Sequence, residues 1–168
     1  MRAIYPGSFN PISLGHLDII HRASKIFEHL LILVADNHEK SNQIGSEERI
    51  KLIKESIGDL NNVEVRAHKG LVVDYAKTNG YKVLLRGIRG ASDFESELEM
   101  SQINHALSDG LETIFLMTSP QHSFIRSSRV WELVRFGGDL SKLVPANVAV
   151  YLTELLKNDI TFFTRPTK

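Results

Sequence analysis

The 168-residue chain is 42% hydrophobic and 24% charged, a composition typical of one folded domain with a substantial core. Its 20 basic residues balance 20 acidic ones, so the overall charge does not favour nonspecific binding to nucleic acid. The absence of cysteine excludes disulfides, thiolate metal sites and a cysteine nucleophile. No apolar run reaches membrane-spanning length and no signal-peptide pattern opens the chain, so we expect a cytoplasmic protein without a membrane partner.

Short apolar runs and helical patterns alternate from the beginning of the chain. The first expected elements are a strand at residues 2–6, a helix with apolar positions from Leu17 to Phe27, and a wholly apolar strand at 30–35. A further helix follows, and Ser46 is placed to be its N-cap, with Glu47 and Glu48 in the first turn.

The second half of the chain continues the same alternation. It predicts strands at 62–68, 82–86 and 112–117, and helices at 72–79, 94–107, about 127–136 and about 145–157. Strands that alternate with helices in this way indicate an α/β fold, with a parallel sheet covered by helices on both faces. We therefore expect a single domain at 1–157, followed by a tail at 158–168 without periodicity.

Ligands of an open parallel sheet bind beyond the carboxyl ends of its strands, and this rule selects four stretches. They are YPGSFNPISLGH at 5–16, ADNHEK at 35–40, RGIRG at 86–90 and TSPQHSFIRSS at 118–128. Cations or clustered hydroxyl groups occur in three of them, which indicates an anionic ligand.

The first stretch combines glycines with a histidine at the start of a helix. Gly7 would let backbone N–H groups approach a phosphate, and helix N-termini favour anions. His16 would then be placed to donate a hydrogen bond to a phosphoryl oxygen. Spacing alone leaves a second interpretation open, namely a turn with Pro and Gly and a capping histidine.

The later stretches are ambiguous when each is taken alone. Arg86 and Arg89 suit bidentate contacts with phosphate, but arginines at strand ends also pair with nearby acids such as Asp93. Ser127 and Ser128 could cap a helix without binding anything. The chain lacks the H-E-x-x-H, G-x-S-x-G and G-x-x-x-x-G-K-[ST] patterns, which argues against a zinc protease, a serine hydrolase and a P-loop enzyme.

In this order, five stretches resemble the bacterial phosphopantetheine adenylyltransferases of the nucleotidyltransferase superfamily. They are YPGSFNPISLGHLDII, GLVVDYA, LLRGIRGASDFESELEMSQIN, ETIFLM and SFIRSSRV, and the similarity runs from Arg2 to about Leu156. Such enzymes transfer the adenylyl group of ATP to 4′-phosphopantetheine, giving dephospho-coenzyme A and pyrophosphate in coenzyme A biosynthesis. The resemblance implies a Rossmann-like, open parallel five-stranded sheet, a catalytic domain at 1–157, Mg²⁺ bound mainly through the ATP phosphates, and a homohexamer.

The resemblance also implies roles for individual residues. His16 would stabilise the transition state at the α-phosphate, and Lys40 and Arg86 would contact the substrate phosphate. Contacts to 4′-phosphopantetheine are implied for Ser8, Lys40, Val72 and Arg86. Contacts to ATP are implied for Ser8, Phe9, His16, Gly87, Ile88, Arg89, Glu97, His122, Ser123, Phe124, Ile125, Arg126, Ser127 and Ser128, and no residue is implied as a metal ligand.

The chain departs from the family pattern at three site positions. Arg126 replaces a serine of the usual I-S-S-S loop, His122 stands where Trp or Tyr is frequent, and Ser13 replaces the Thr or His of [TH]-x-G-H. We expect Arg126 to tune the affinity for ATP or pyrophosphate. Two alternatives remain: another small-molecule nucleotidyltransferase, such as one acting on nicotinamide mononucleotide, and a nucleotide-binding protein without turnover.

Overall fold

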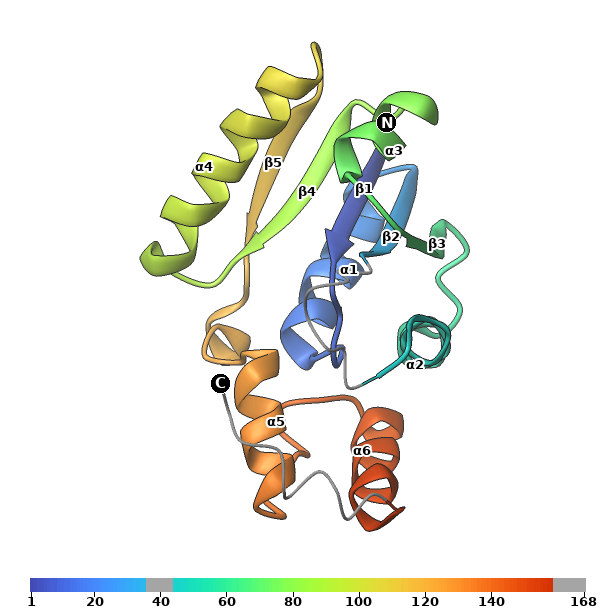
Figure 1. The fold of residues 1–168 in the computed structure, drawn as a ribbon, viewed down its shortest axis with the longest axis vertical. Helices are drawn as coiled ribbons and strands as arrows, with labels where there is room; N and C mark the ends of the chain where they lie inside the picture. The colour runs from blue at the N-terminus through green and yellow to red at the C-terminus, as the bar shows by residue number, and fades with distance from the viewer. Residues whose placement is uncertain (36–43, 159–168) are drawn as a thin grey trace.

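A computed structural model of the chain describes residues 1–35 and 44–158 (Figure 1). Within these ranges, five parallel strands form one sheet in the order β3-β2-β1-β4-β5. The strands are β1 (Arg2–Gly7), β2 (His29–Ala35), β3 (Val63–His68), β4 (Val83–Ile88) and β5 (Glu112–Met117). The parallel five-stranded sheet predicted from the sequence is confirmed.

Helices connect the strands, and the last two helices lie beyond one end of the sheet. They are α1 (Leu14–Ile26), α2 (Ser46–Ile57), α3 (Val72–Thr78), α4 (Ala91–Leu107), the short 3₁₀ helix η1 (Pro120–His122), α5 (Ser127–Arg135) and α6 (Ala146–Asn158). In Figure 1, α5 and α6 lie below the sheet, at the end toward which the arrowheads of the strands point. The two C-terminal helices therefore stand next to the edge where an open parallel sheet binds ligands.

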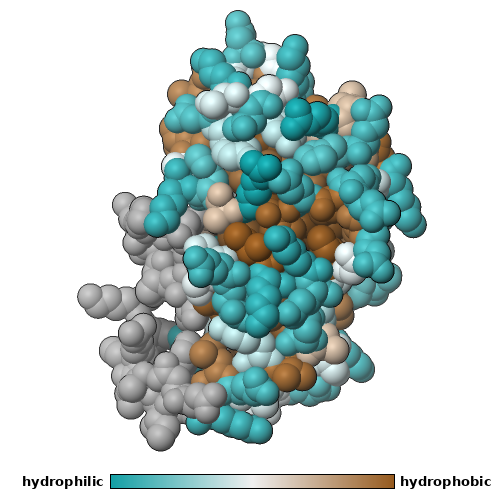
Figure 2. Space-filling view, turned by 90° about the vertical axis from the view of Figure 1, so that its right-hand side faces the viewer, coloured by the Kyte–Doolittle hydropathy of each residue, from teal (hydrophilic) through white to brown (hydrophobic). Residues whose placement is uncertain are grey.

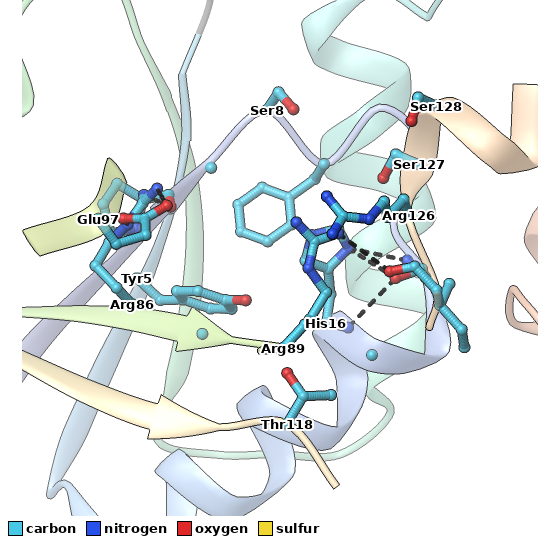
Figure 3. A pocket seen from close by; sticks show the side chains of 17 residues that line it. Tyr5, Ser8, His16, Arg86, Arg89, Glu97, Thr118, Arg126, Ser127 and Ser128 are labelled. Carbon is cyan, nitrogen blue, oxygen red and sulfur yellow. Dashed lines mark hydrogen bonds and ion pairs between the residues drawn. The ribbon is translucent and has the colours of Figure 1, made fainter. Parts of the chain in front are cut away.

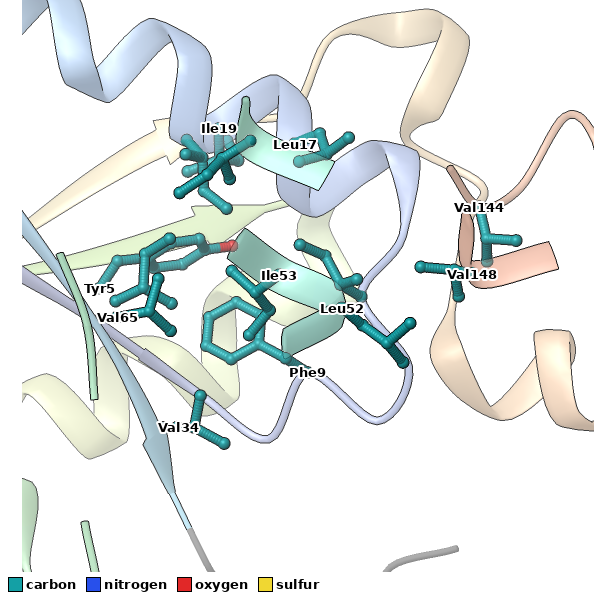
Figure 4. Close-up of a cluster of buried hydrophobic side chains, with 14 of the residues drawn as sticks. Tyr5, Phe9, Leu17, Ile19, Val34, Leu52, Ile53, Val65, Val144 and Val148 are labelled. Carbon is teal, nitrogen blue, oxygen red and sulfur yellow. The ribbon is translucent and has the colours of Figure 1, made fainter. Parts of the chain in front are cut away.

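Alternate strand residues build two cores, one on each face of the sheet. On one face Tyr5, Ile32 and Leu85 pack with apolar residues of α1, α2, α5 and α6 (Figure 4). On the other face Leu31 and Leu84 pack with residues of α3. The period of two expected for strands thus places helices on both faces, as the sequence predicted.

Helix α4 covers β4 and β5 incompletely, on the same face as α3. The ring centroids of Phe94 on α4 and Phe115 on β5 lie 5.7 Å apart. No residue of α4 is buried.

Figure 2 shows the side of the molecule that carries α2 and β3, where the surface is mostly hydrophilic around a central hydrophobic area.

Two local predictions were wrong. Strand β4 continues through Gly87 to Ile88, whereas the sequence placed these residues in a loop. A Cβ on Gly87 would lie 3.1 Å from Ile19 and 3.3 Å from the Tyr5 hydroxyl, so the close approach of these side chains favours glycine at this strand position. Ser46 is the first residue of α2 and not its N-cap, a position that Gly45 occupies.

Candidate active site

A cavity of about 420 Å³ lies at the carboxyl ends of β1 and β4. These two strands are the switch point of the sheet, because the chain leaves β1 for α1 on one face and leaves β4 for α4 on the other. Figure 3 shows side chains from both strands, from α1 and from the start of α5 converging on this cavity. The lining residues are Tyr5, Pro6, Gly7, Ser8, Phe9, Ser13, Gly15, His16, Arg86, Gly87, Arg89, Glu97, Thr118, Ile125, Arg126, Ser127 and Ser128.

Most of the site residues expected from the sequence meet at this cavity. Those that line it are Ser8, Phe9, His16, Arg86, Gly87, Arg89, Glu97, Ile125, Arg126, Ser127 and Ser128. Ile88, His122, Ser123, Phe124 and Val72 do not line it. Ile88 is buried in the sheet, and Phe124 is 63% exposed. Lys40 lies outside the described residues.

Tyr5 and Thr118 line the cavity although the sequence did not single them out. Tyr5 is a buried strand residue, and nothing in the apolar pattern around it distinguishes it from the core. Thr118 directly follows β5 and begins the stretch 118–128 that the strand-end rule selected, but no role of its own was assigned to it from the sequence.

Buried hydrogen bonds hold the loop that follows β1. Arg49 of α2, 1% exposed, donates to the carbonyl oxygens of Ser8 at 2.7 Å, Ile44 at 3.0 Å and Ala35 at 3.3 Å. The Ser127 hydroxyl at the start of α5 donates to the Pro11 carbonyl oxygen at 3.0 Å. Helix α2 and the start of α5 thus hold the loop from Ser8 to Pro11.

His16 occupies the third position of α1 and takes part in a capping box with Ser13. Its ring lies 5.1 Å from the Phe9 ring, centroid to centroid. Burial, followed by the charges of Arg89 and Arg86, lowers the pKa of His16 to about 4. The imidazole is therefore neutral at physiological pH in the ligand-free protein.

Arg86 is held by a bidentate ion pair with Glu97 of α4. The Arg86 guanidinium donates to the two Glu97 carboxylate oxygens at 2.5 and 2.6 Å and to the Pro6 carbonyl oxygen at 2.8 Å. Burial opposes the charge of Arg86, but the bonds to Glu97 outweigh it and raise the pKa of Arg86. The bidentate bond with Glu97 and the bond to Pro6 fix a planar cation beside β1.

Two further arginines share one carboxylate at the opposite side of the cavity. Arg89 donates to Asp93 at 2.6 Å, and Arg126 lies 3.3 Å from the other oxygen of the same carboxylate. Arg89 also donates to the Ile125 carbonyl oxygen at 3.2 Å. Asp93 therefore joins the end of β4 to the start of α5 and keeps two positive charges close together.

Asp18 of α1 fixes the segment that follows β5. It accepts hydrogen bonds from the Ser119 hydroxyl at 2.6 Å and from the Ser119 N–H at 2.9 Å. Burial acts to raise the pKa of Asp18, but the Ser119 and Arg22 donors prevail and the pKa is lowered. The same helix thus carries His16 and holds the backbone next to Thr118.

Positive charge dominates the lining. Arg86, Arg89 and Arg126 contribute three cations, against the single carboxylate of Glu97 among the described lining residues. Helix α5 begins at the cavity without a side-chain cap, so its first N–H groups are available to an anion. The charge of the lining and the open start of α5 suit an anionic ligand.

Comparisons with known proteins agree with this arrangement. Residues 4–133 match the family model described as cytidylyltransferase-like. The phosphopantetheine adenylyltransferase of Gloeothece citriformis (strain PCC 7424) is 50% identical over 153 residues, which cover 91% of this chain and 98% of that protein. The corresponding protein of Rubrobacter xylanophilus is 48% identical, over 87% of this chain and 89% of that protein. The chain belongs to the phosphopantetheine adenylyltransferase family.

A solved structure supports the same fold. It is that of a proposed nicotinate-nucleotide adenylyltransferase from Vibrio parahaemolyticus, with a TM-score of 0.63 at 18% identity, over 98% of this chain and 96% of that chain. At this identity the likeness shows the nucleotidyltransferase fold alone. Helices long and apolar enough to cross a membrane are absent from the described residues, and so are groups of three or more His, Cys, Asp or Glu side chains that could hold a metal.

Proposed function

We propose that this phosphopantetheine adenylyltransferase family member transfers the adenylyl group of ATP to 4′-phosphopantetheine. The observation that carries the proposal is the near-complete alignment to relatives of that name, at 50% identity, joined to a cationic cavity at the switch point of the sheet. A phosphate oxygen of the acceptor attacks the α-phosphorus of ATP and forms the new P–O bond. The bond to the bridging oxygen of the β-phosphate breaks, so the products are dephospho-coenzyme A and pyrophosphate.

The attacking group is already an anion, so the protein needs no nucleophile of its own. Catalysis then consists of aligning two polyanions and stabilising the charge that develops at the α-phosphate. In this mechanism His16 donates a hydrogen bond to the α-phosphate and Arg86 holds the acceptor phosphate. Arg89, Arg126 and the start of α5 hold the β- and γ-phosphates and then the leaving pyrophosphate.

Other assignments from the sequence stay predictions. Lys40 as a second contact to the acceptor phosphate lies outside the described residues. Val72 is the first residue of α3 and packs against the core that contains Leu31 and Leu84. Its contact with the pantetheine arm stays a prediction. A cytoplasmic location is likewise a prediction.

Mg²⁺ would be bound mainly through ATP oxygens and water. The carboxylate that lines the cavity, Glu97, is engaged by Arg86, and Asp93 nearby is engaged by Arg89 and Arg126. Their negative charge is thus already balanced, which favours a metal ion carried in by the triphosphate. Bound there, Mg²⁺ would neutralise phosphate charge.

Pyrophosphate release separates this function from the alternatives. The protein is incubated with ATP and Mg²⁺, and with 4′-phosphopantetheine, nicotinamide mononucleotide, nicotinate mononucleotide or an alcohol phosphate as acceptor. Release with 4′-phosphopantetheine alone supports the proposal. Release only with another acceptor identifies a different nucleotidyltransferase, and ATP binding without release identifies a binding protein.

Arg126→Ser is expected to weaken the binding of ATP and pyrophosphate several-fold while turnover at saturating ATP persists. The reason is the position of Arg126 at the cavity, where its charge adds to that of Arg89. Because the Arg126 side chain is 45% exposed, solvent screens this contribution. Isothermal titration calorimetry measures both affinities. Arg129→Ser is the control, since Arg129 is a 70% exposed residue of the same helix and pairs with Glu132.

Unchanged affinities in Arg126→Ser, equal to those of Arg129→Ser, would show that the arginine does not contact the phosphates. A loss of turnover at saturating ATP would show instead that it acts on the chemical step.

The surface of α4 supports assembly into a homohexamer. Its apolar residues are between 38% and 53% exposed, at Phe94, Leu98, Met100, Ile103 and Leu107, and Ile114 and Met117 of β5 are also exposed. An apolar surface of this extent is typical of a protein interface. Size exclusion with light scattering is expected to give six times the 18.9 kDa chain mass, and Leu98→Asp is expected to lower it. A monomer mass for the parent chain would contradict the hexamer.

A further inference from the structure

The capping box of α1 places the histidine ring between a backbone donor and the cavity. The Ser13 N–H donates to His16 Nδ1 at 3.1 Å, and the Ser13 hydroxyl lies 3.1 Å from the same nitrogen. The His16 N–H donates back to the Ser13 hydroxyl oxygen at 3.4 Å. In most capping boxes a Glu or Gln side chain occupies this third position, so here the capping group also lines a binding site.

This geometry decides which ring nitrogen carries the proton. A backbone N–H can only donate, so Nδ1 of His16 must accept with its lone pair. In a neutral imidazole the other nitrogen is then the donor. Nε2 makes no hydrogen bond within residues 1–35 and 44–158 and belongs to a ring that lines the cavity. The N–H group of Nε2 is therefore the one available to a ligand.

The surroundings also disfavour a second proton on the ring. If Nδ1 were protonated, its hydrogen would point at the hydrogen of the Ser13 N–H, and the two donors would repel each other. Burial and the charges of Arg89 and Arg86 act in the same direction, which agrees with a His16 pKa of about 4. The Phe9 ring, 5.1 Å away, offers no acceptor.

The acidic groups near the His16 ring do not offset the positive charge of these arginines. Glu97 on α4 is bonded to Arg86. Asp93, at the start of the same helix, is bonded to Arg89 and to Arg126 at the N-terminus of α5. The groups on β4, α4 and α5 that face His16 thus present positive or balanced charge, and none of them accepts a proton from Nδ1.

We propose that Ser13 is a positioning residue that holds His16 as the neutral tautomer with its proton on Nε2, ready to donate to the α-phosphate. The catalytic part of this inference rests on the proposed adenylyl transfer, whereas the tautomer is a property of the protein itself. A preset neutral donor needs no proton from solvent when ATP binds. It also avoids an imidazolium beside two arginines in the empty site.

The tautomer is tested directly on the full chain. Two-dimensional ¹H–¹⁵N spectra of the ¹⁵N-labelled protein at neutral pH are compared with those of His16→Gln, which assigns the His16 signals. We expect an unprotonated Nδ1, a protonated Nε2, and a titration midpoint well below the ordinary value of 6.5. A proton on Nδ1, or a doubly protonated ring at neutral pH, would overturn the inference.

Two substitutions test the role of Ser13. Ser13→Asp keeps a good N-cap but sets a carboxylate beside Nδ1, which attracts a proton there. We expect the His16 midpoint to rise and kcat to fall on the order of 10- to 100-fold, with little change in the KM for ATP. Ser13→Thr keeps the hydroxyl and is expected to match the parent in the His16 midpoint and in kcat.

The outcomes separate this inference from the proposed function. If the parent shows the expected tautomer but releases no pyrophosphate with 4′-phosphopantetheine, the function fails and the positioning of His16 stands. If a folded Ser13→Asp leaves both the midpoint and kcat unchanged, the Ser13 side chain does not position the ring, and that part of the inference is overturned. If Ser13→Asp does not fold, as a melting curve would show, the spectra of the parent still decide the tautomer.

Discussion

His16→Ala is expected to lower kcat at least about 100- to 1,000-fold, the usual loss when one donor to a transition-state oxyanion is removed. His16 lines the cavity beside Arg86 and Arg89, and in the proposed mechanism its hydrogen bond strengthens as charge develops at the α-phosphate. The KM for ATP should change much less, because the arginines and the start of α5 bind the triphosphate. Steady-state pyrophosphate release with 4′-phosphopantetheine as acceptor measures both constants.

The fold should survive this substitution. The hydrogen bonds between His16 Nδ1 and Ser13 are lost together with the ring contact to Phe9, which is expected to cost about 1–2 kcal/mol of stability. His21→Ala is the matched control, because His21 lies on the same helix and is exposed. Near-normal turnover in His16→Ala would remove His16 from the mechanism. A collapsed melting curve would mean that the histidine is structural.

The alternation of apolar strands and amphipathic helices was enough to predict the parallel sheet. Strand β2 is apolar from Leu30 to Ala35 because both faces of the sheet are covered, which is the pattern that a central parallel strand requires. The end of β4 was missed because glycine ordinarily signals a turn. The glycine at this position is favoured by the close approach of Tyr5 and Ile19, which are distant in sequence, and local patterns cannot reveal such a contact.

The site could be predicted in its residue types but not in its pairings. Carboxyl strand ends and the resemblance to the adenylyltransferases selected His16, Arg86 and Arg89, and all three line the cavity. Pairing of Arg89 with Asp93 was the alternative that the sequence left open beside a phosphate contact, and the structure shows this pair. Glu97 was expected to contact nucleotide, and its bidentate bond with Arg86 depends on how α4 packs against β4.

The pairing of Arg86 with Glu97 makes Arg86→Ala a substitution with two expected effects. Turnover should fall at least about 100-fold, because the cation proposed to hold the acceptor phosphate is lost. Stability should fall by about 1–3 kcal/mol, because the Glu97 carboxylate, 20% exposed, loses its partner. Pyrophosphate release and urea unfolding measure the two effects. The control is Arg66→Ala, which breaks an exposed pair with Glu64 and should leave stability nearly unchanged, because solvent screens such pairs.

The double variant Arg86→Ala/Glu97→Ala separates the structural role of the pair from its role in catalysis. Removing both charges leaves no unpaired carboxylate, so stability should return to within about 1 kcal/mol of the parent. Turnover should stay as low as in Arg86→Ala, because a neutral cavity wall cannot hold the acceptor phosphate. Recovery of turnover together with stability would instead show that the pair acts only through the packing of α4 on β4. The guanidinium would then be a support for the site and not a ligand of the substrate.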